Sequence, residues 1–179
     1  MNAPDEIGEL PLHRALCDNV RLGSIKLIVK GNPSAIRCYD KNGTTPLQVA
    51  CQHHESPSVI QYLIELGEDT LDTMDKEGNT AIHYACRGAQ HKMIALLLDR
   101  YGAVSVSKQN VHNQLPIDLL FESNAEVNGR GGIEYAGSMF LLLRAYPDTI
   151  NCISNNMTQR AASREERLSQ NTKKRKVDM

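Results

Sequence analysis

The chain has 179 residues, 41% of them hydrophobic, which is enough for one ordinary domain with its own core. Aromatic residues make up only 4% and Trp is absent, so the core must be aliphatic, which favours stacked helices over an aromatic-lined catalytic cleft. From Arg160 onward seven bases and three acids give about +4, whereas the 13 bases and 18 acids before it give about −5. An acidic body argues against nucleic-acid binding by that body.

The start of the chain carries acids and lacks a basic stretch followed by an apolar one, so we expect no secretory signal. No segment approaches the roughly 20 apolar residues that a membrane span needs. Five cysteines, an odd number, fit free thiols in a reducing compartment. The sequence therefore predicts an intracellular protein, cytoplasmic or nuclear, without a membrane segment.

Residues 75–86 nearly repeat the sequence of residues 40–51, 35 positions later. The same step places aliphatic residues in one column, namely Leu12, Leu47, Ile82 and Ile117. A fixed period of this size indicates a repeat protein.

Each unit begins with turn chemistry, because Asp bonds its own backbone and Gly accepts positive φ. These residues are Asp5, Gly8, Asp40, Gly43, Asp75 and Gly78. Thr45 and Thr80 then stand at expected helix N-caps, and Pro46 at a first helical position.

A second helix is predicted in each unit from aliphatic residues at helical spacing. We expect these helices to end at Gly31, Gly67 and Gly102 in left-handed caps. Two short helices cannot bury their apolar faces alone, whereas stacked units can. The predicted fold class is therefore all-α, with hairpin-like turns between the units.

The segments 10–15, 45–50, 80–85 and 115–120 are four versions of Thr-Pro-Leu-His-x-Ala, and the chain resembles the ankyrin repeat family. The resemblance implies a solenoid of about four repeats, near 5–39, 40–74, 75–109 and 110–153, within a domain over 4–153. It also implies that the rings of His13 and His83 bond the backbone and the capping Thr between units.

The terminal units depart from the pattern, as end repeats of solenoids do. Leu10 replaces the capping Thr in the first unit. In the fourth unit Asn113 replaces the turn Gly, Asp118 replaces the His, and an insert near 122–132 precedes a helix over 133–145 that ends against Pro147. We interpret both units as caps, and residues 154–179 as a disordered basic tail.

No catalytic or cofactor motif is present: the sequence has no Cys-x-x-Cys, Gly-x-Ser-x-Gly or Gly-x-x-x-x-Gly-Lys. Cys51, His53 and His54 could suggest zinc, but adjacent histidines point to different sides of a helix and no second pair stands at finger spacing. Cys51 and Cys86 share one repeat column, which indicates buried small hydrophobes. Residues 128–132 could cradle an anion, but a flexible insert explains them more simply. We expect no enzyme, metal or cofactor.

Ankyrin repeat proteins usually bind partners with turn tips and the exposed faces of the first helices, so the resemblance implies a partner-binding surface. On this sequence it comprises Lys41, Asn42, Thr44, Gln52, His53, Lys76, Glu77, Asn79, Arg87, His112 and Gln114. Its mixed charge favours a protein partner over nucleic acid. The alternative is that these are ordinary solvated polar residues. The predicted function is a monomeric, non-catalytic protein-interaction module.

A short basic run near the end of the tail resembles a nuclear import signal read by an import receptor. It consists of Lys173, Lys174, Arg175 and Lys176. The alternative is a solubilising tail. If the run acts in import, the chain would be a nuclear regulatory adaptor.

Overall fold

The computed structural model describes residues 10–53, 56–101, 104–126 and 132–147. The chain divides into two compact units, 1–146 and 147–179, and Pro147 is the only described residue of the second. The described residues form eight α-helices and three short 3-10 helices and contain no strand, which confirms the all-α prediction. The predicted tail and the first turn, with Asp5 and Gly8, lie outside the described residues.

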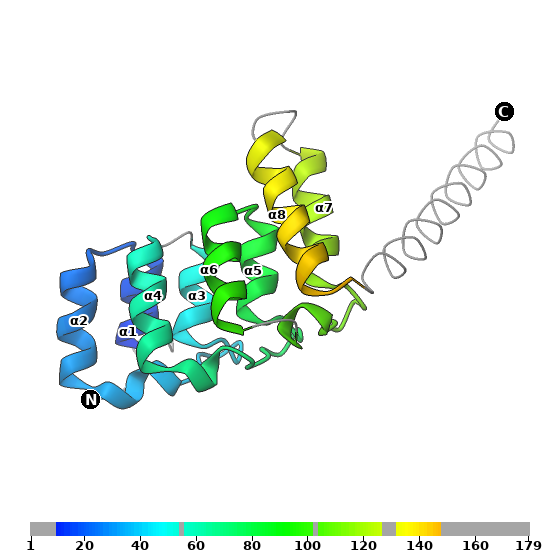
Figure 1. Cartoon of the computed structure of the whole chain (residues 1–179). Coiled ribbons are helices and arrows are strands. Elements are labelled where there is room, and N and C mark those ends of the chain that lie inside the picture. Colours follow the sequence, from blue (N-terminus) through cyan, green and yellow to red (C-terminus); the bar gives the residue numbers. More distant parts are fainter. Residues whose placement is uncertain (1–9, 54–55, 102–103, 127–131, 148–179) are drawn as a thin grey trace, which may run out of the picture. The chain divides into compact units, whose positions relative to one another are not determined.

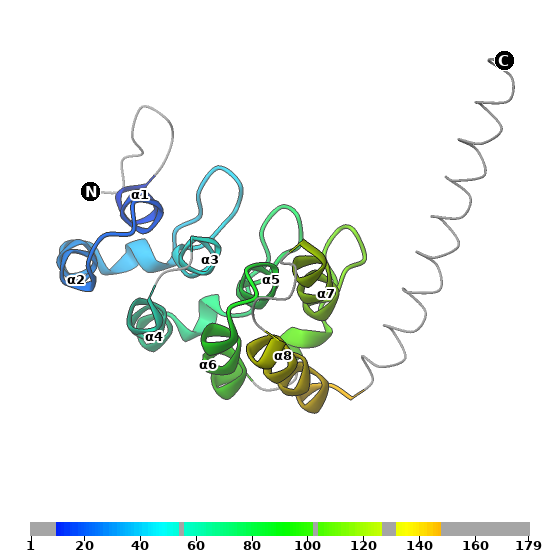
Figure 2. The same cartoon turned by 90° about the horizontal axis from the view of Figure 1, so that it is seen from above.

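The helices form two rows, which are easiest to see from above (Figure 2). The first helices are α1 (Pro11–Cys17), α3 (Pro46–Gln52), α5 (Ala81–Arg87) and α7 (Pro116–Glu126). The second helices are α2 (Leu22–Gly31), α4 (Pro57–Leu66), α6 (His91–Tyr101) and α8 (Gly132–Ala145). The 3-10 helices η1 (Pro33–Arg37), η2 (Glu68–Thr70) and η3 (Val104–Ser107) follow α2, α4 and α6. Each first helix packs against the next one, and so does each second helix (Figure 1).

The first helices begin where the sequence predicts, because local side chains satisfy their free N–H groups. Thr45 and Gln48 form a capping box, in which the Thr45 N–H donates to Gln48 Oε1 at 2.7 Å. Thr80 caps α5 in the same way through His83. Leu10 offers α1 no side-chain cap, as expected for the first unit.

The turns before α3, α5 and α7 share one construction. A side-chain oxygen of their first residue accepts the backbone N–H groups two and four positions later, at 2.8 to 3.0 Å; these residues are Asp40, Asp75 and Asn110. The fourth turn residue has positive φ; these residues are Gly43, Gly78 and Asn113. Asn tolerates the left-handed region better than most residues, so it can replace the glycine.

The core includes the column of aliphatic residues found in the sequence and one Ile from each of three second helices. Leu12, Leu47, Ile82 and Ile117 are buried, as are Ile25, Ile60 and Ile94. Ala50 and Ala85 are fully buried in α3 and α5, where their small side chains allow neighbouring first helices to approach closely.

The predicted left-handed caps at the second helices are wrong. Gly31 is the last residue of α2, and Gly67 has φ −140, so neither residue occupies the left-handed region; Gly102 lies outside the described residues. Gly67 is needed for space instead, because an added Cβ would lie 2.6 Å from Ile36 Cγ2. The expected insert near 122–132 is helical at both ends, since α7 continues to Glu126 and α8 begins at Gly132.

None of the described helices has the length and apolar character required to cross a membrane.

Candidate protein-binding surface

Three buried side chains in one column connect α1, α3 and α5 to the turn of the next unit. The His13 Nε2–H donates to Thr44 O at 3.0 Å, the Gln48 amide donates to Asn79 O at 2.8 Å, and the His83 Nε2–H donates to Gln114 O at 3.3 Å. Each bond spans 31 residues. Both histidines bond the backbone of the next unit, as the resemblance implied, and His83 also bonds the capping Thr80; before His13 this capping position is Leu10. The equivalent role of Gln48 was missed, although its place in the same column was the available signal.

His83 is held as a neutral ring. Its Nδ1 accepts the N–H and hydroxyl of Thr80 at 3.1 and 2.9 Å, so the proton lies on Nε2, which faces Gln114 O. Burial lowers the pKa of His83 to about 4. The hydrogen bonds and the pKa indicate a structural link rather than a ligand role.

The turn carboxylates are part of the frame as well. Asp75 is buried and accepts the Tyr84 hydroxyl at 2.5 Å in addition to its two turn N–H groups. Burial and this carboxylate raise the pKa of Tyr84. At Asp40, partial burial acts to raise the pKa, but hydrogen bonds from Thr44 and Asn42 outweigh it and hold the pKa below its usual value.

Two members of the predicted surface are buried, which corrects the sequence-based assignment. Thr44 and Asn79 are each 3% exposed. At this point of the turn the backbone N–H donates to the Asp side chain that opens the turn, which draws the residue inward. The Asn79 side-chain oxygen also accepts a hydrogen bond from Asn110 in the following turn. Their side chains stabilise the turns and do not reach a partner.

Successive turn tips are bonded to one another in a row. The tips comprise residues 41–43, 76–78 and 111–113, and they project beyond the first helices (Figure 2). The Lys76 N–H donates to Asn42 O at 3.1 Å, and the Val111 N–H donates to Glu77 O at 2.9 Å. Side chains add to this row: Lys76 Nζ donates to Lys41 O at 2.6 Å. His112 Nε2 lies 3.4 Å from a Glu77 carboxylate oxygen, an ion pair whenever the ring is protonated.

The remaining predicted residues form two strips. The turn strip contains Lys41, Asn42, Lys76, Glu77 and His112, which are exposed, and Gln114, which is half-buried and donates to Glu122. The helix-end strip contains Gln52, His53 and Arg87, which are exposed at the C-terminal ends of α3 and α5. A helix of seven residues is about 10 Å long, so the two strips lie roughly that far apart.

The cysteines and histidines that might have suggested metal binding are separated. Cys51 and Cys86 are fully buried, and burial raises the pKa of both thiols, as expected of small core side chains. His53 is exposed beyond the end of α3, and His54 lies outside the described residues. Within the described ranges, no group of three His, Cys, Asp or Glu side chains could hold a metal ion.

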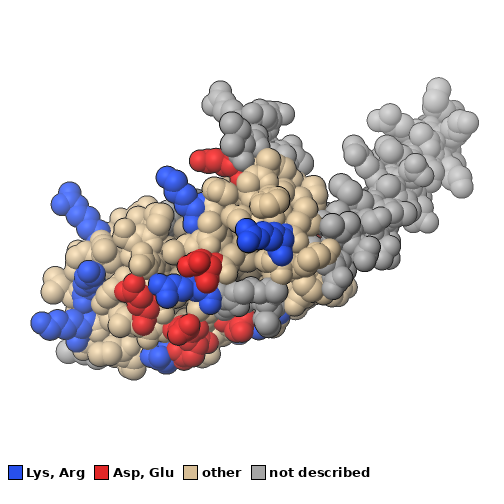
Figure 3. Space-filling view, in the orientation of Figure 1, with Lys and Arg blue, Asp and Glu red and all other residues tan. Residues whose placement is uncertain are grey.

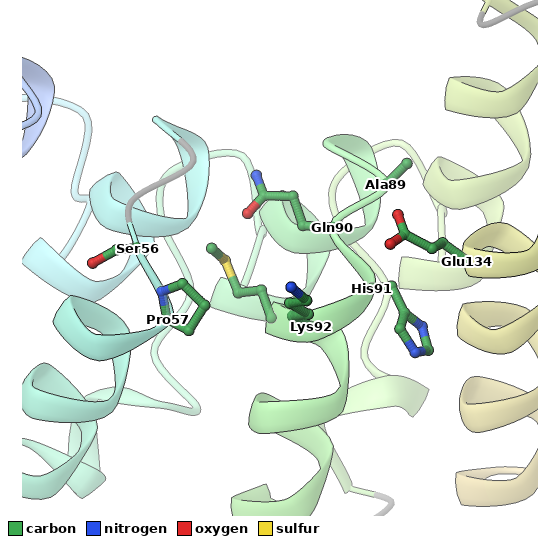
Figure 4. Close-up of a pocket in the computed structure, with 8 residues that line it drawn as sticks. Ser56, Pro57, Ala89, Gln90, His91, Lys92 and Glu134 are labelled. Carbon is green, nitrogen blue, oxygen red and sulfur yellow. The ribbon is translucent and has the colours of Figure 1, made fainter. Parts of the chain in front are cut away.

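A pocket of about 410 Å³ lies near the N-terminal ends of α4, α6 and α8 (Figure 4). His91 points toward α8, where its Nδ1 lies 3.1 Å from Ser138 Oγ and its ring packs against Gly137. Pro57 and Glu134 line opposite sides of the pocket (Figure 4). The side chains that line this pocket therefore do not converge on one ligand atom, as the side chains of a catalytic site would.

Helix pairs stacked in register, with turns bonded in a row, define a helical repeat protein with an exposed, hydrogen-bonded turn surface. A family model described as ankyrin repeats (3 copies) matches residues 12–110, and the chain belongs to the ankyrin repeat family. Repeats of this family are generally protein–protein interaction modules and are typically non-enzymatic. A comparison with curated proteins finds no match.

Proposed function

We propose that this chain is a non-catalytic module that binds a protein partner through the turn strip and the helix-end strip. The observation that carries the proposal is the pair of backbone bonds, Lys76 N to Asn42 O and Val111 N to Glu77 O, that hold the three turn tips in a row. A surface ordered before binding loses less conformational entropy when it meets its partner. Exposed polar side chains on such a frame suit specific recognition.

The charges of the two strips favour a protein partner. In the turn strip Lys41 and Lys76 are basic and Glu77 is acidic, and in the helix-end strip Arg87 is basic. A surface that carries both signs complements a partner with its own charge pattern, whereas Glu77 would repel a uniform polyanion. Nucleic acid is therefore the less favoured partner for these strips.

A pull-down with a matched control tests the proposal. The variant Gln52→Ala/His53→Ala/Arg87→Ala removes exposed side chains of the helix-end strip, and Lys92→Ala/Asp99→Ala/Arg100→Ala removes exposed side chains of α6. Both variants should melt like the wild type, because surface changes rarely cost more than about 0.5 kcal/mol. Partners recovered with the wild type and the α6 variant should be lost with the helix-end variant. Equal recovery of every partner by all three proteins would contradict the assigned strip.

We further propose that α7 and α8 form a fourth, divergent repeat and that the domain acts as a monomer. The Asn110 turn, and Asp118, whose carboxylate accepts the Leu115 N–H at 2.9 Å, support the fourth repeat because they reproduce the turn and cap of the earlier units. Light scattering across a range of concentrations tests the monomer, since a mass that rises with concentration would contradict it.

A second proposed role is that of a nuclear adaptor. The basic run Lys173, Lys174, Arg175 and Lys176 supports it, although these residues lie outside the described ranges. In a fluorescent fusion expressed in cells, replacing the four residues with alanine should move the protein out of the nucleus. An unchanged distribution would remove the nuclear role and leave a cytoplasmic module.

A further inference from the structure

An apolar groove with a basic edge lies between α2, η1 and α4. α2 and α4 belong to the row of second helices, not to the side of the turn tips (Figure 2). The volume of the groove is about 500 Å³. Val29 and Ile36 are buried in its floor, while Tyr62 and Leu66 remain partly exposed; Leu66 is 41% exposed. A partly exposed Tyr and Leu over a buried aliphatic floor provide a place for an apolar side chain of a partner.

The basic edge comes from a stretch without acids. Residues 20–37 contain Arg21, Lys26, Lys30 and Arg37 and no Asp or Glu. Lys and Arg side chains accordingly gather at the α2 end of the molecule (Figure 3). Only part of this charge is compensated: the Arg37 guanidinium makes two bonds of 2.8 Å to Asp69.

The ammonium groups of Lys26 and Lys30 are accessible to a partner. Lys26 Nζ lies 5.3 Å from the centroid of the Tyr62 ring, so it is held over the groove by a cation–π contact. Lys30 is exposed and has no acidic partner within the described part of the chain. The two residues are four positions apart on α2, so their side chains lie on one face of the helix, about 6 Å apart along its axis.

The repeat itself does not require these lysines. In the register of the buried Ile25, Ile60 and Ile94, the matching positions are Gln61 and Glu65 on α4 and Ala95 and Asp99 on α6. The Gln61 amide donates to Glu65 at 3.1 Å. This face of the second helix is thus basic in the first unit and acidic in the second and third units. The lysine pair is a property of this one groove.

We propose that the groove is a second docking surface, separate from the turn strip, and that it binds an acidic amphipathic peptide segment of a partner protein. An apolar side chain of the segment packs on Tyr62 and Leu66, and two carboxylates one helical turn apart pair with Lys26 and Lys30. The apolar floor favours a peptide over nucleic acid, which would present phosphates without aliphatic side chains.

A designed peptide tests the docking surface directly. The probe is a fluorescein-labelled, blocked peptide of about 14 residues, with Leu at helical spacing and Glu at the flanking positions. A second peptide carries Gln in place of each Glu, and a labelled single-stranded oligonucleotide serves as a polyanion without apolar side chains. Binding to the full chain is measured by fluorescence anisotropy at about 50 mM salt, where screening is weak.

The Glu peptide should bind saturably, and the Gln peptide and the oligonucleotide should bind at least about tenfold more weakly. Lys26→Glu/Lys30→Glu and, separately, Leu66→Asp should each weaken the Glu peptide about tenfold or more. Lys41→Glu/Lys76→Glu makes the same charge change on the turn tips and should leave binding within about twofold. Lys30→Glu alone should also weaken binding, and it removes no contact on which folding depends.

The proposal is overturned if the Glu peptide does not saturate, or if reversal of the groove lysines leaves its affinity unchanged. It is equally overturned if the Gln peptide or the oligonucleotide binds as well as the Glu peptide, or if the turn-tip variant loses binding to the same extent. None of these results bears on the helix-end pull-down, which tests a different surface, so the two proposals fail separately.

Discussion

Replacing His83 with glutamine should remove an acid-sensitive step from the stability of the folded chain. His83 is buried, and burial lowers its pKa to about 4, from an ordinary value of about 6.5. As the pH falls, the unfolded chain therefore takes up this proton before the folded chain does. The neutral His83 ring therefore contributes fully to the free energy of unfolding above about pH 6.5. This contribution is lost as the pH falls through the folded pKa.

The magnitude follows from the difference between the two pKa values. Each unit corresponds to about 1.4 kcal/mol, so His83 should cost the folded state about 2 kcal/mol at pH 5 and about 3 kcal/mol at pH 4 relative to neutral pH. Glutamine should preserve the fold, because Gln48 already makes the equivalent two bonds in the preceding unit, accepting the Thr45 N–H and donating to Asn79 O. A net change within about 1 kcal/mol is expected at neutral pH.

Urea unfolding followed by far-ultraviolet circular dichroism measures the effect, since the chain has no Trp for fluorescence. The free energies of unfolding of the wild type and His83→Gln are compared at about pH 7.5 and about pH 5. All other titrating groups are common to both proteins, so the change in their difference isolates His83. We expect the variant to gain about 2 kcal/mol on the wild type between the two conditions. An equal difference at both pH values would refute the reasoning.

Three further results are expected. Leu97→Ala should lower the free energy of unfolding by about 2 to 5 kcal/mol, because Leu97 is fully buried in α6; a loss below about 1 kcal/mol in urea titration would contradict its core position. Gly67→Ala should destabilise by about 1 to 3 kcal/mol, since the added methyl would lie 2.6 Å from a neighbouring methyl, whereas Gly31→Ala, with open space around it, should be neutral or slightly stabilising; equal melting temperatures for the two variants would argue against the clash. Cys51 and Cys86, whose pKa values burial raises, should resist a thiol reagent in the native protein and react after unfolding, and mass spectrometry of the labelled chain would expose any early reaction.

The starts of the first helices could be predicted because their causes are local. Thr45, Pro46 and Thr80 act within three residues of the N–H groups that they satisfy or replace, so the sequence alone displays the whole interaction. The turn glycines Gly43 and Gly78 were predictable for the same reason, since positive φ is a property of one residue.

The roles that depend on a neighbouring unit could not be predicted in this way. Thr44 and Asn79 look like turn-tip polar residues in the sequence, but the fold places both in the interior. Gly67 looks like a helix cap in the sequence, but glycine is needed there because Ile36 of the preceding unit approaches too closely for a Cβ. Gln48 looks like a departure from histidine, but its amide reaches the same kind of carbonyl as the ring does.

The class of fold follows from the amino-acid sequence alone, because a period of 35 residues with turn, cap and aliphatic columns in register allows little besides stacked helix pairs. Helix packing, in contrast, sets which polar residues are exposed and which basic residues border an apolar groove. Lys26 and Tyr62 belong to different units, and only the packing of α2 beside α4 brings them together. The physical reason is that helix starts and turns depend on bonds within a few residues, whereas burial and grooves depend on side chains supplied by the next unit of the stack.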